Sequence, residues 1–109
     1  MNDKLIELLC AILQEKAHPS VGKSHSFAVG RSYLIRTVTM MYTGRIEAIT
    51  ESDLWLKDAA WIADSGRYHT ALSEGTLNEV EPYPDYVIVT RQSIVDSAPW
   101  RHELPRTQK

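Results

Sequence analysis

A glycine lies shortly after the longest run of strand-forming residues in this chain of 109 residues. The run from Tyr33 to Tyr42 is β-branched, aromatic or apolar at every position except Arg36, and Gly44 comes two residues after it. Glycine within a strand pattern marks a bend or a close approach of two backbones, and a small barrel needs such a bend to close. We therefore predict two strands around a corner at Gly44.

A third strand is predicted from Leu54 to Ala63, because apolar residues alternate along it. Leu54 and Leu56 are expected on one face, and Trp55 and Trp61 on the other. Tryptophan on a partly exposed face needs a cover, which the N-terminal helix, a neighbouring subunit or a ligand can supply.

Two short strands are predicted near the end of the chain, at Tyr86–Thr90 and at Ile94–Ala98. Only Arg91, Gln92 and Ser93 separate them, so the turn between them is tight. The tail that follows, residues 99–109, is polar apart from Trp100 and Leu104. We expect its first half to dock and its end to fray.

An amphipathic helix is predicted over residues 2–18, because apolar residues recur there at spacings of three and four. Asn2 can cap it and Pro19 stops it. The apolar stretch inside it is too short to cross a bilayer, so no membrane partner is expected.

The segment 65–85 is predicted to be an insertion between the third and fourth strands. A short helix through Tyr68 and Leu72 is expected to begin at a cap on Asp64 or Ser65 and to end at Gly75 in a left-handed conformation. The polar run 76–84 contains two prolines, so it is predicted as a surface loop.

Composition favours one globular domain over residues 1–109, with 43% hydrophobic and 24% charged residues. The single cysteine, Cys10, excludes an intrachain disulfide and favours the cytoplasm. The formal net charge of −2 provides no global attraction to nucleic acid, although repetition of the chain in an oligomer would concentrate a small basic patch.

No motif predicts catalysis or a cofactor. Gly22, Lys23 and Ser24 match only the end of a phosphate-binding loop, and Ala17 stands where its first glycine belongs. The four histidines lack the short pairings that place two imidazoles on one metal ion. We therefore predict no catalytic residue, no metal, no cofactor and no enzymatic activity.

Two segments carry a resemblance to a known family. Gly44–Ile49 followed by Leu54–Ala59 is similar to the first motif of the Sm-like family, with spacing close to its bacterial branch. Val89–Val95 is similar to the second, shorter motif, which has a basic and a polar residue on the turn between the last two strands. The chain thus resembles a bacterial or phage-type member, although other small SH3-type barrels give similar strand patterns.

The resemblance implies a mainly β fold with an N-terminal helix. Its body is a strongly bent five-stranded Sm-like barrel over residues 32–98, with the short helix inserted between strands 3 and 4. Members of the family pair their last two strands between subunits, which implies a cyclic homo-oligomer of this chain. The expected subunit contacts are Val87, Val89, Ile94 and Trp100.

The resemblance also implies a site for single-stranded RNA beside the central pore. Arg91 and Gln92 would line it, next to the loop that contains Ser52 and Asp53. Asp53 is a departure, because many relatives have an uncharged residue there and a carboxylate repels phosphate. A structural or adaptor ring without nucleic acid is therefore the alternative. Arg91 could equally pair with Asp96 or Asp85 on the surface.

Overall fold

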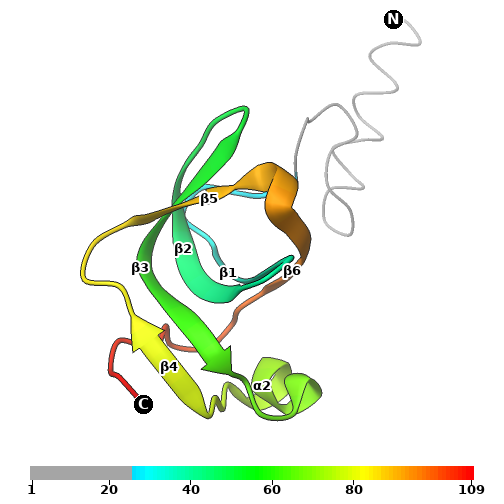
Figure 1. The fold of residues 1–109 in the computed structure, drawn as a ribbon, viewed down its shortest axis with the longest axis vertical. Coiled ribbons are helices and arrows are strands. Elements are labelled where there is room, and N and C mark those ends of the chain that lie inside the picture. The colour runs from blue at the N-terminus through cyan, green and yellow to red at the C-terminus, as the bar shows by residue number, and fades with distance from the viewer. Residues whose placement is uncertain (1–25) are drawn as a thin grey trace, which may run out of the picture.

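The computed structural model describes residues 26–109, and the predicted helix over residues 2–18 lies outside them. Figure 1 shows six strands curled into a small barrel, with one short α-helix at its lower end. The elements in chain order are β1 (Ser32–Thr37), β2 (Met41–Ile49), β3 (Asp53–Asp64), α2 (Tyr68–Glu74), β4 (Glu79–Pro82), β5 (Val87–Thr90), the 3₁₀ helix η1 (Arg91–Ser93) and β6 (Ile94–Pro99).

All the strand pairs are antiparallel, in the order β4-β3-β2-β1-β6, and β5 also pairs with β3. The long strand β3 serves two partners: its first residues pair with β5 and its last residues pair with β4. Thus β4 and β5 are two halves of one edge of the sheet. The predicted barrel is confirmed, with one more strand than expected.

The extra strand corrects the prediction that residues 76–84 form a loop. Val80 lies opposite Ile62, and Pro82 ends the strand opposite Ala60. Proline removes a backbone donor and is tolerated at an edge, so the two prolines of this run exclude a central strand but not β4.

The sheet bends where Gly44 lies against β3. A Cβ atom at Gly44 would lie 3.1 Å from the Cβ atoms of both Leu56 and Ala59, so a side chain there would require β3 to move by a few tenths of an ångström. The register shifts at this point, and Asp58 takes a positive φ of 51°. This β-bulge sharpens the bend, as such bulges do. The predicted corner at Gly44 is confirmed.

The same bulge corrects the prediction that Trp55 and Trp61 share a face. Trp61 lies opposite Tyr42, which packs against the barrel interior. Trp55 lies opposite Ile88, whose neighbours along β5 point inward. An extra residue in a strand reverses the alternation beyond it, so the two tryptophans lie on opposite faces.

Two hydrophobic clusters occupy the two faces of the sheet. The inner cluster fills the barrel and consists of Tyr33, Ile35, Ile46, Leu54, Leu56, Ala59 and Val89. The outer cluster lies between the sheet and the segments that cover it, and consists of Leu34, Ala60, Ile62, Ala71, Leu77, Val80 and Trp100.

The helix α2 lies where a helix was predicted, and Gly75 ends it with φ of 78°, as expected. Its N-cap is Arg67, whose side chain makes no capping hydrogen bond. The predicted cap was wrong: Asp64 instead accepts a hydrogen bond from the amide of Gly66, 2.8 Å away, and so shapes the turn before the helix.

Residues 100–109 form what we call the strap, and they pack along their length. The indole of Trp100 is buried and donates to the carbonyl of Glu103. Lys109 exchanges two backbone hydrogen bonds with Val80, so the prediction that the end of the chain frays was wrong.

Candidate nucleic-acid interface

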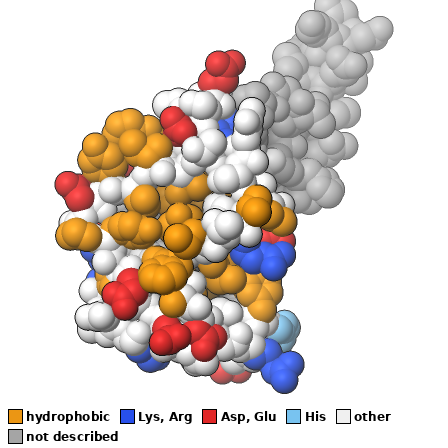
Figure 2. Space-filling model, viewed as in Figure 1, with side chains coloured by type: hydrophobic (Ala, Val, Ile, Leu, Met, Phe, Trp, Pro, Cys, Tyr) orange, Lys and Arg blue, Asp and Glu red, His pale blue; other side chains and the backbone are white. Residues whose placement is uncertain are grey.

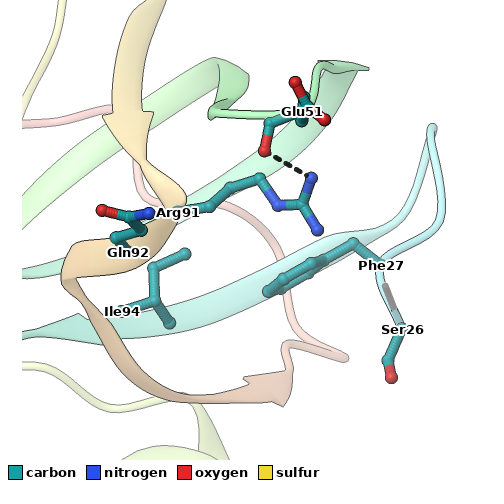
Figure 3. A pocket seen from close by; sticks show the side chains of 6 residues that line it. All are labelled: Ser26, Phe27, Glu51, Arg91, Gln92 and Ile94. Carbon is teal, nitrogen blue, oxygen red and sulfur yellow. Dashed lines mark hydrogen bonds between the residues drawn. The ribbon is translucent and has the colours of Figure 1, made fainter. Parts of the chain in front are cut away.

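The turn η1 and the hairpin between β2 and β3 meet at one end of the barrel. The amide of Arg91 donates to the carbonyl of Ser52 at 2.8 Å. The guanidinium of Arg91 donates through Nη1 to the carbonyl of Thr50 at 2.7 Å. The same nitrogen donates to the carbonyl of Glu51 at 3.0 Å (Figure 3). The predicted tight turn is therefore joined to the predicted loop by the residue expected to bind RNA.

The hairpin itself is held by Thr50. Its amide donates to the carbonyl of Asp53 at 2.9 Å, and its hydroxyl accepts from the amide of Asp53 at 2.9 Å. Threonine side chains commonly close turns in this way. The carbonyls that receive Arg91 are consequently fixed in direction before any ligand arrives.

A hollow of about 380 Å³ lies beside this junction. Figure 3 shows side chains of η1, of the hairpin and of the chain before β1 around it. Its walls are formed by Ser26, Phe27, Glu51, Arg91, Gln92 and Ile94. Of the four residues predicted to bind RNA, Arg91 and Gln92 line the hollow, and Ser52 and Asp53 follow Glu51 along the hairpin.

The electrostatics of the site are mixed. The hydroxyl of Ser52 donates to the carboxylate of Asp53 at 3.1 Å, and Asp53 is half-buried at the start of β3. Glu51 adds a second carboxylate beside Arg91. A phosphate approaching Arg91 would meet both acids, each of which repels it.

Sequence reasoning missed Phe27. Its ring packs edge-to-face on Tyr33, with centroids 5.3 Å apart, and forms one wall of the hollow. The available signal was weak: Phe27 is the only phenylalanine of the chain and sits in a run that otherwise favours a loop. An aromatic wall offers a flat surface on which a base can stack.

The predicted subunit contacts are only partly on the surface. Val89 and Trp100 are each 4% exposed and belong to the inner and outer clusters. Val87 and Ile94 are half-buried against the inner cluster. In the single chain, Val89 and Trp100 therefore leave little side-chain surface for a contact with another subunit.

Different residues of the same strands are exposed. Ile88 on β5 is 45% exposed and Val95 on β6 is 62% exposed. Beside Ile88, Tyr86 stacks on Trp55 with ring centroids 5.0 Å apart and an angle of 15° between the rings. Figure 2 shows hydrophobic side chains gathered over the middle of the face drawn.

One of the two acids that Arg91 could alternatively pair with has another partner. Asp96 binds Arg36 through two hydrogen bonds, one of 2.7 Å from Nε. This pairing holds the pKa of Asp96 below its ordinary value and raises the pKa of Arg36. Arg36 also lies 5.0 Å over the ring of Tyr68, so it links β6 to α2.

Residues 26–109 contain no group of histidine, cysteine and acidic side chains arranged to hold a metal ion. In the same part of the chain, no helix has the length and apolar character needed to span a membrane.

Comparison with known proteins gives similarity in structure alone. No family model and no curated protein sequence matches the chain. A crystal structure of a heptameric archaeal Sm protein is similar, with 16% identity and a TM-score of 0.48, over 65% of this chain and 87% of the other. The SmAP1 heptamer of P. aerophilum is similar at the same identity and TM-score, over 65% of this chain and 80% of the other.

The fold of this chain is mainly β. A strongly bent antiparallel sheet closes through the 3₁₀ turn η1, with one short helix between β3 and β4. The bent sheet and the inserted helix are those that the sequence predicted for an Sm-like barrel, and β4 is the strand that it did not predict.

Proposed function

We propose that this chain is the subunit of a closed homo-oligomeric ring that binds single-stranded RNA through η1 and the β2–β3 hairpin. The proposal rests on one observation: two strands in the described part of the chain each have a partner strand on one side and an unpaired edge on the other. Within residues 26–109, β5 pairs with β3 alone and β6 pairs with β1 alone. Unpaired strand edges bind other strands, and β5 of one copy can pair with β6 of the next.

The exposed residues Ile88 and Val95 support this pairing, because each lies on one of the two strands. Such a contact joins two different surfaces, so it repeats around an axis and closes into a ring when the rotation permits. Self-association would bury both side chains and complete the hydrogen bonding of both strands.

The position of η1 connects subunit assembly with RNA binding. Because η1 connects the two strands that would pair between copies, each contact brings one copy of Arg91 toward the next. Repetition concentrates positive charge that a single chain of net charge −2 lacks. Arg91 would bind phosphate or stack on a base, while Gln92 and Phe27 would contact bases.

A ring without nucleic acid is the second candidate, and Glu51 and Asp53 favour it because they lie beside Arg91. In either case we propose one domain over residues 1–109 without enzymatic activity. We place it in the cytoplasm, because a chain with one cysteine forms no internal disulfide.

The ring is tested by the mass of the particle in solution, measured by sedimentation velocity. We expect the double variant Ile88→Glu and Val95→Glu to remain folded, because both side chains are exposed, and to run as a monomer. Val29→Glu is the matched control, since Val29 is 61% exposed and belongs to neither strand. A wild-type protein that is monomeric at micromolar concentration would contradict the ring.

RNA binding is tested by titrating the protein against labelled U-rich and A-rich strands at near-physiological salt. Arg91→Ala should lower the affinity by roughly tenfold or more, because every subunit loses one cation at the pore. Arg67→Ala removes the same charge at the start of α2 and should bind like the wild type. Unchanged melting temperatures would show that both variants are folded. Absence of binding to either strand by the wild type would leave the structural ring.

A further inference from the structure

The split edge of the sheet is covered on one half and open on the other. Along β4, the amide of Val80 donates to the carbonyl of Lys109 at 3.0 Å, and the amide of Lys109 donates to the carbonyl of Val80 at 2.9 Å. Two residues that exchange both backbone bonds form an antiparallel strand pair. The strap therefore adds itself to β4, and β5 has no such cover within the described residues.

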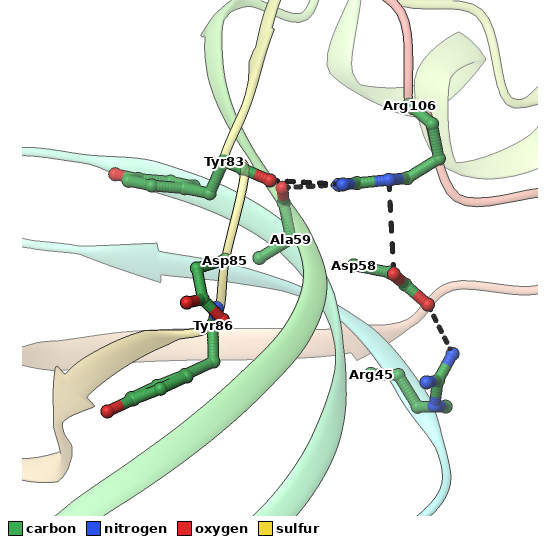
Figure 4. Close-up of polar contacts among 7 residues, drawn as sticks. All are labelled: Arg45, Asp58, Ala59, Tyr83, Asp85, Tyr86 and Arg106. Atoms are coloured by element: carbon green, nitrogen blue, oxygen red, sulfur yellow. Dashed lines mark hydrogen bonds and ion pairs between the residues drawn. The ribbon is translucent and has the colours of Figure 1, made fainter.

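Arg106 anchors the strap at the gap between the two halves. Its guanidinium donates to the carbonyl of Ala59 at 2.8 Å and to the carbonyl of Tyr83 at 3.0 Å, and lies 4.0 Å from the carboxylate of Asp58 (Figure 4). Asp58 is held from its other side by Arg45 at 2.9 Å. One side chain thus reaches the bulge of β3 and the residue that follows β4.

The charges of the two segments are complementary. The exposed positions of β4 include Glu79 and Glu81, and the strap brings Arg106 and Lys109. The side-chain amide of Gln108 donates to the carboxylate of Glu81 at 3.2 Å. Figure 2 shows acidic side chains on the lower part of the face drawn, the part in which Figure 1 places β4. A basic extended segment therefore fits this edge in both hydrogen bonding and charge.

We propose that β4 is a docking strand for a basic extended segment, and that residues 106–109 of the same chain occupy it. The occupied edge directs self-association to β5, so that on this edge of the sheet β6 of a second copy can add only beside Val87–Thr90. The claim that self-association is directed to β5 rests on the proposed ring. The claim that residues 106–109 occupy β4 does not depend on the ring.

The physical reason for such a cover lies in the behaviour of open edges. An exposed strand edge offers unpaired backbone groups to any other chain, and long open edges lead to aggregation. If β4 were open, the edge would run over both halves, and copies could add in more than one register. Covering β4 leaves β5 as the one open strand that the described residues place on this edge of β3, so that β6 of another copy can add there in one geometry.

The cover is tested by amide hydrogen exchange of Val80, followed by NMR in the full chain. Lys109→Pro removes the amide that donates to Val80 and disturbs the reciprocal bond, so the Val80 amide should exchange roughly fivefold faster or more. Lys109→Arg keeps both the backbone amide and the positive charge and should leave the rate near that of the wild type. Unchanged exchange in Lys109→Pro would overturn the occupation of β4.

Arg106→Ala provides a second variant that acts through the side chain. It should also speed exchange at Val80, because three contacts of the anchor are lost together. Arg101→Ala removes the same charge from an exposed position of the strap and is the matched control. Equal rates in these two variants would show that Arg106 does not hold the strap on β4.

The consequence for assembly is read from particle mass against concentration. Lys109→Pro and Arg106→Ala should give larger or heterogeneous particles, whereas the wild type keeps one mass. Faster exchange at Val80 with an unchanged mass would overturn the guiding role of the strap and keep the occupation of β4. A monomeric wild type with a slowly exchanging Val80 would overturn the ring and leave the covered edge intact.

Discussion

The two hydrophobic clusters are built from the same strands but by different parts of the sequence. In β1, Leu34 belongs to the outer cluster and Ile35 to the inner one, and in β3 Ala60 and Ala59 are divided in the same way. Every member of the inner cluster comes from a strand of the barrel, whereas the outer cluster also needs α2, the residues before β4 and Trp100. The barrel closes on itself, and the insertion and the strap then cover its outside.

This difference predicts that the inner cluster contributes most to global stability. Leu56 is fully buried in the barrel beside Gly44. Leu56→Ala removes three carbon atoms and leaves a cavity between strands that cannot move together, so it should lower the free energy of unfolding by about 3–4 kcal/mol. Urea denaturation measures the change. A loss equal to that of a substitution in the outer cluster would contradict the ranking.

A substitution in the outer cluster should lower the free energy of unfolding by less, and its effect should be local. Leu77 is 5% exposed and lies before β4, where the chain can adjust. Leu77→Ala should cost about 2 kcal/mol. Hydrogen exchange should quicken in α2 and β4 while the amides that pair β1 with β2 stay protected. Uniform acceleration across all strands would show that the two clusters unfold as one unit.

The inner cluster is also the part of the fold that the sequence predicts well. Alternating apolar residues and Gly44 indicate the strands and the corner, because those signals are local. The outer cluster depends on a bulge and on long-range strand pairing, which the local sequence pattern does not indicate. The bulge at Asp58 reverses the faces of β3, and Val80 becomes a strand residue only because β3 and the strap provide partners.

The residues of the candidate site also fall into two groups, those that the sequence indicates and those that it does not. Arg91 and Gln92 could be identified because a tight turn between two short strands is a local signal, and the structure places both in the wall of the hollow. Phe27 could not, because it approaches the site through its packing on Tyr33. Trp100 was assigned to a subunit contact, since the sequence does not reveal that the outer cluster buries it.

A smaller effect is expected where the strap crosses the end of α2. Gly75 has φ of 78°, and a Cβ atom there would lie 2.7 Å from Cγ of His102, whose Nε2 lies 2.8 Å from the carbonyl of Leu72. Gly75→Ala should cost about 1–2 kcal/mol, partly through the left-handed backbone and partly through displacement of His102. Gly30→Ala separates the two causes, because Gly30 has φ of 90° and nothing within 4 Å. Equal losses in the two variants would show that His102 moves aside at no cost.

The smallest effect is expected on the surface of the outer cluster, where Arg36 joins Asp96 of β6 to Tyr68 of α2. Both members of the ion pair are well exposed, so solvent screens the attraction. The pairing lowers the pKa of Asp96 in the folded protein. Its contribution to stability is therefore present above the pKa of the unfolded chain and is lost as the pH falls through the folded value.

The variant Asp96→Asn removes this titration. Its melting temperature should lie slightly below that of the wild type at pH 7. The gap should begin to narrow below about pH 4, where the unfolded chain takes up the proton, and should close only as the pH falls below the lowered pKa of Asp96 in the folded protein. Added salt at pH 7 should narrow the gap as well. Glu103→Gln removes a charge from an exposed position of the strap and should leave the melting temperature unchanged at either pH. A gap that stays constant as the pH is lowered would mean that Asp96 acts through packing or hydrogen bonding that survives protonation, and that charge does not hold β6 to α2 across the outer cluster.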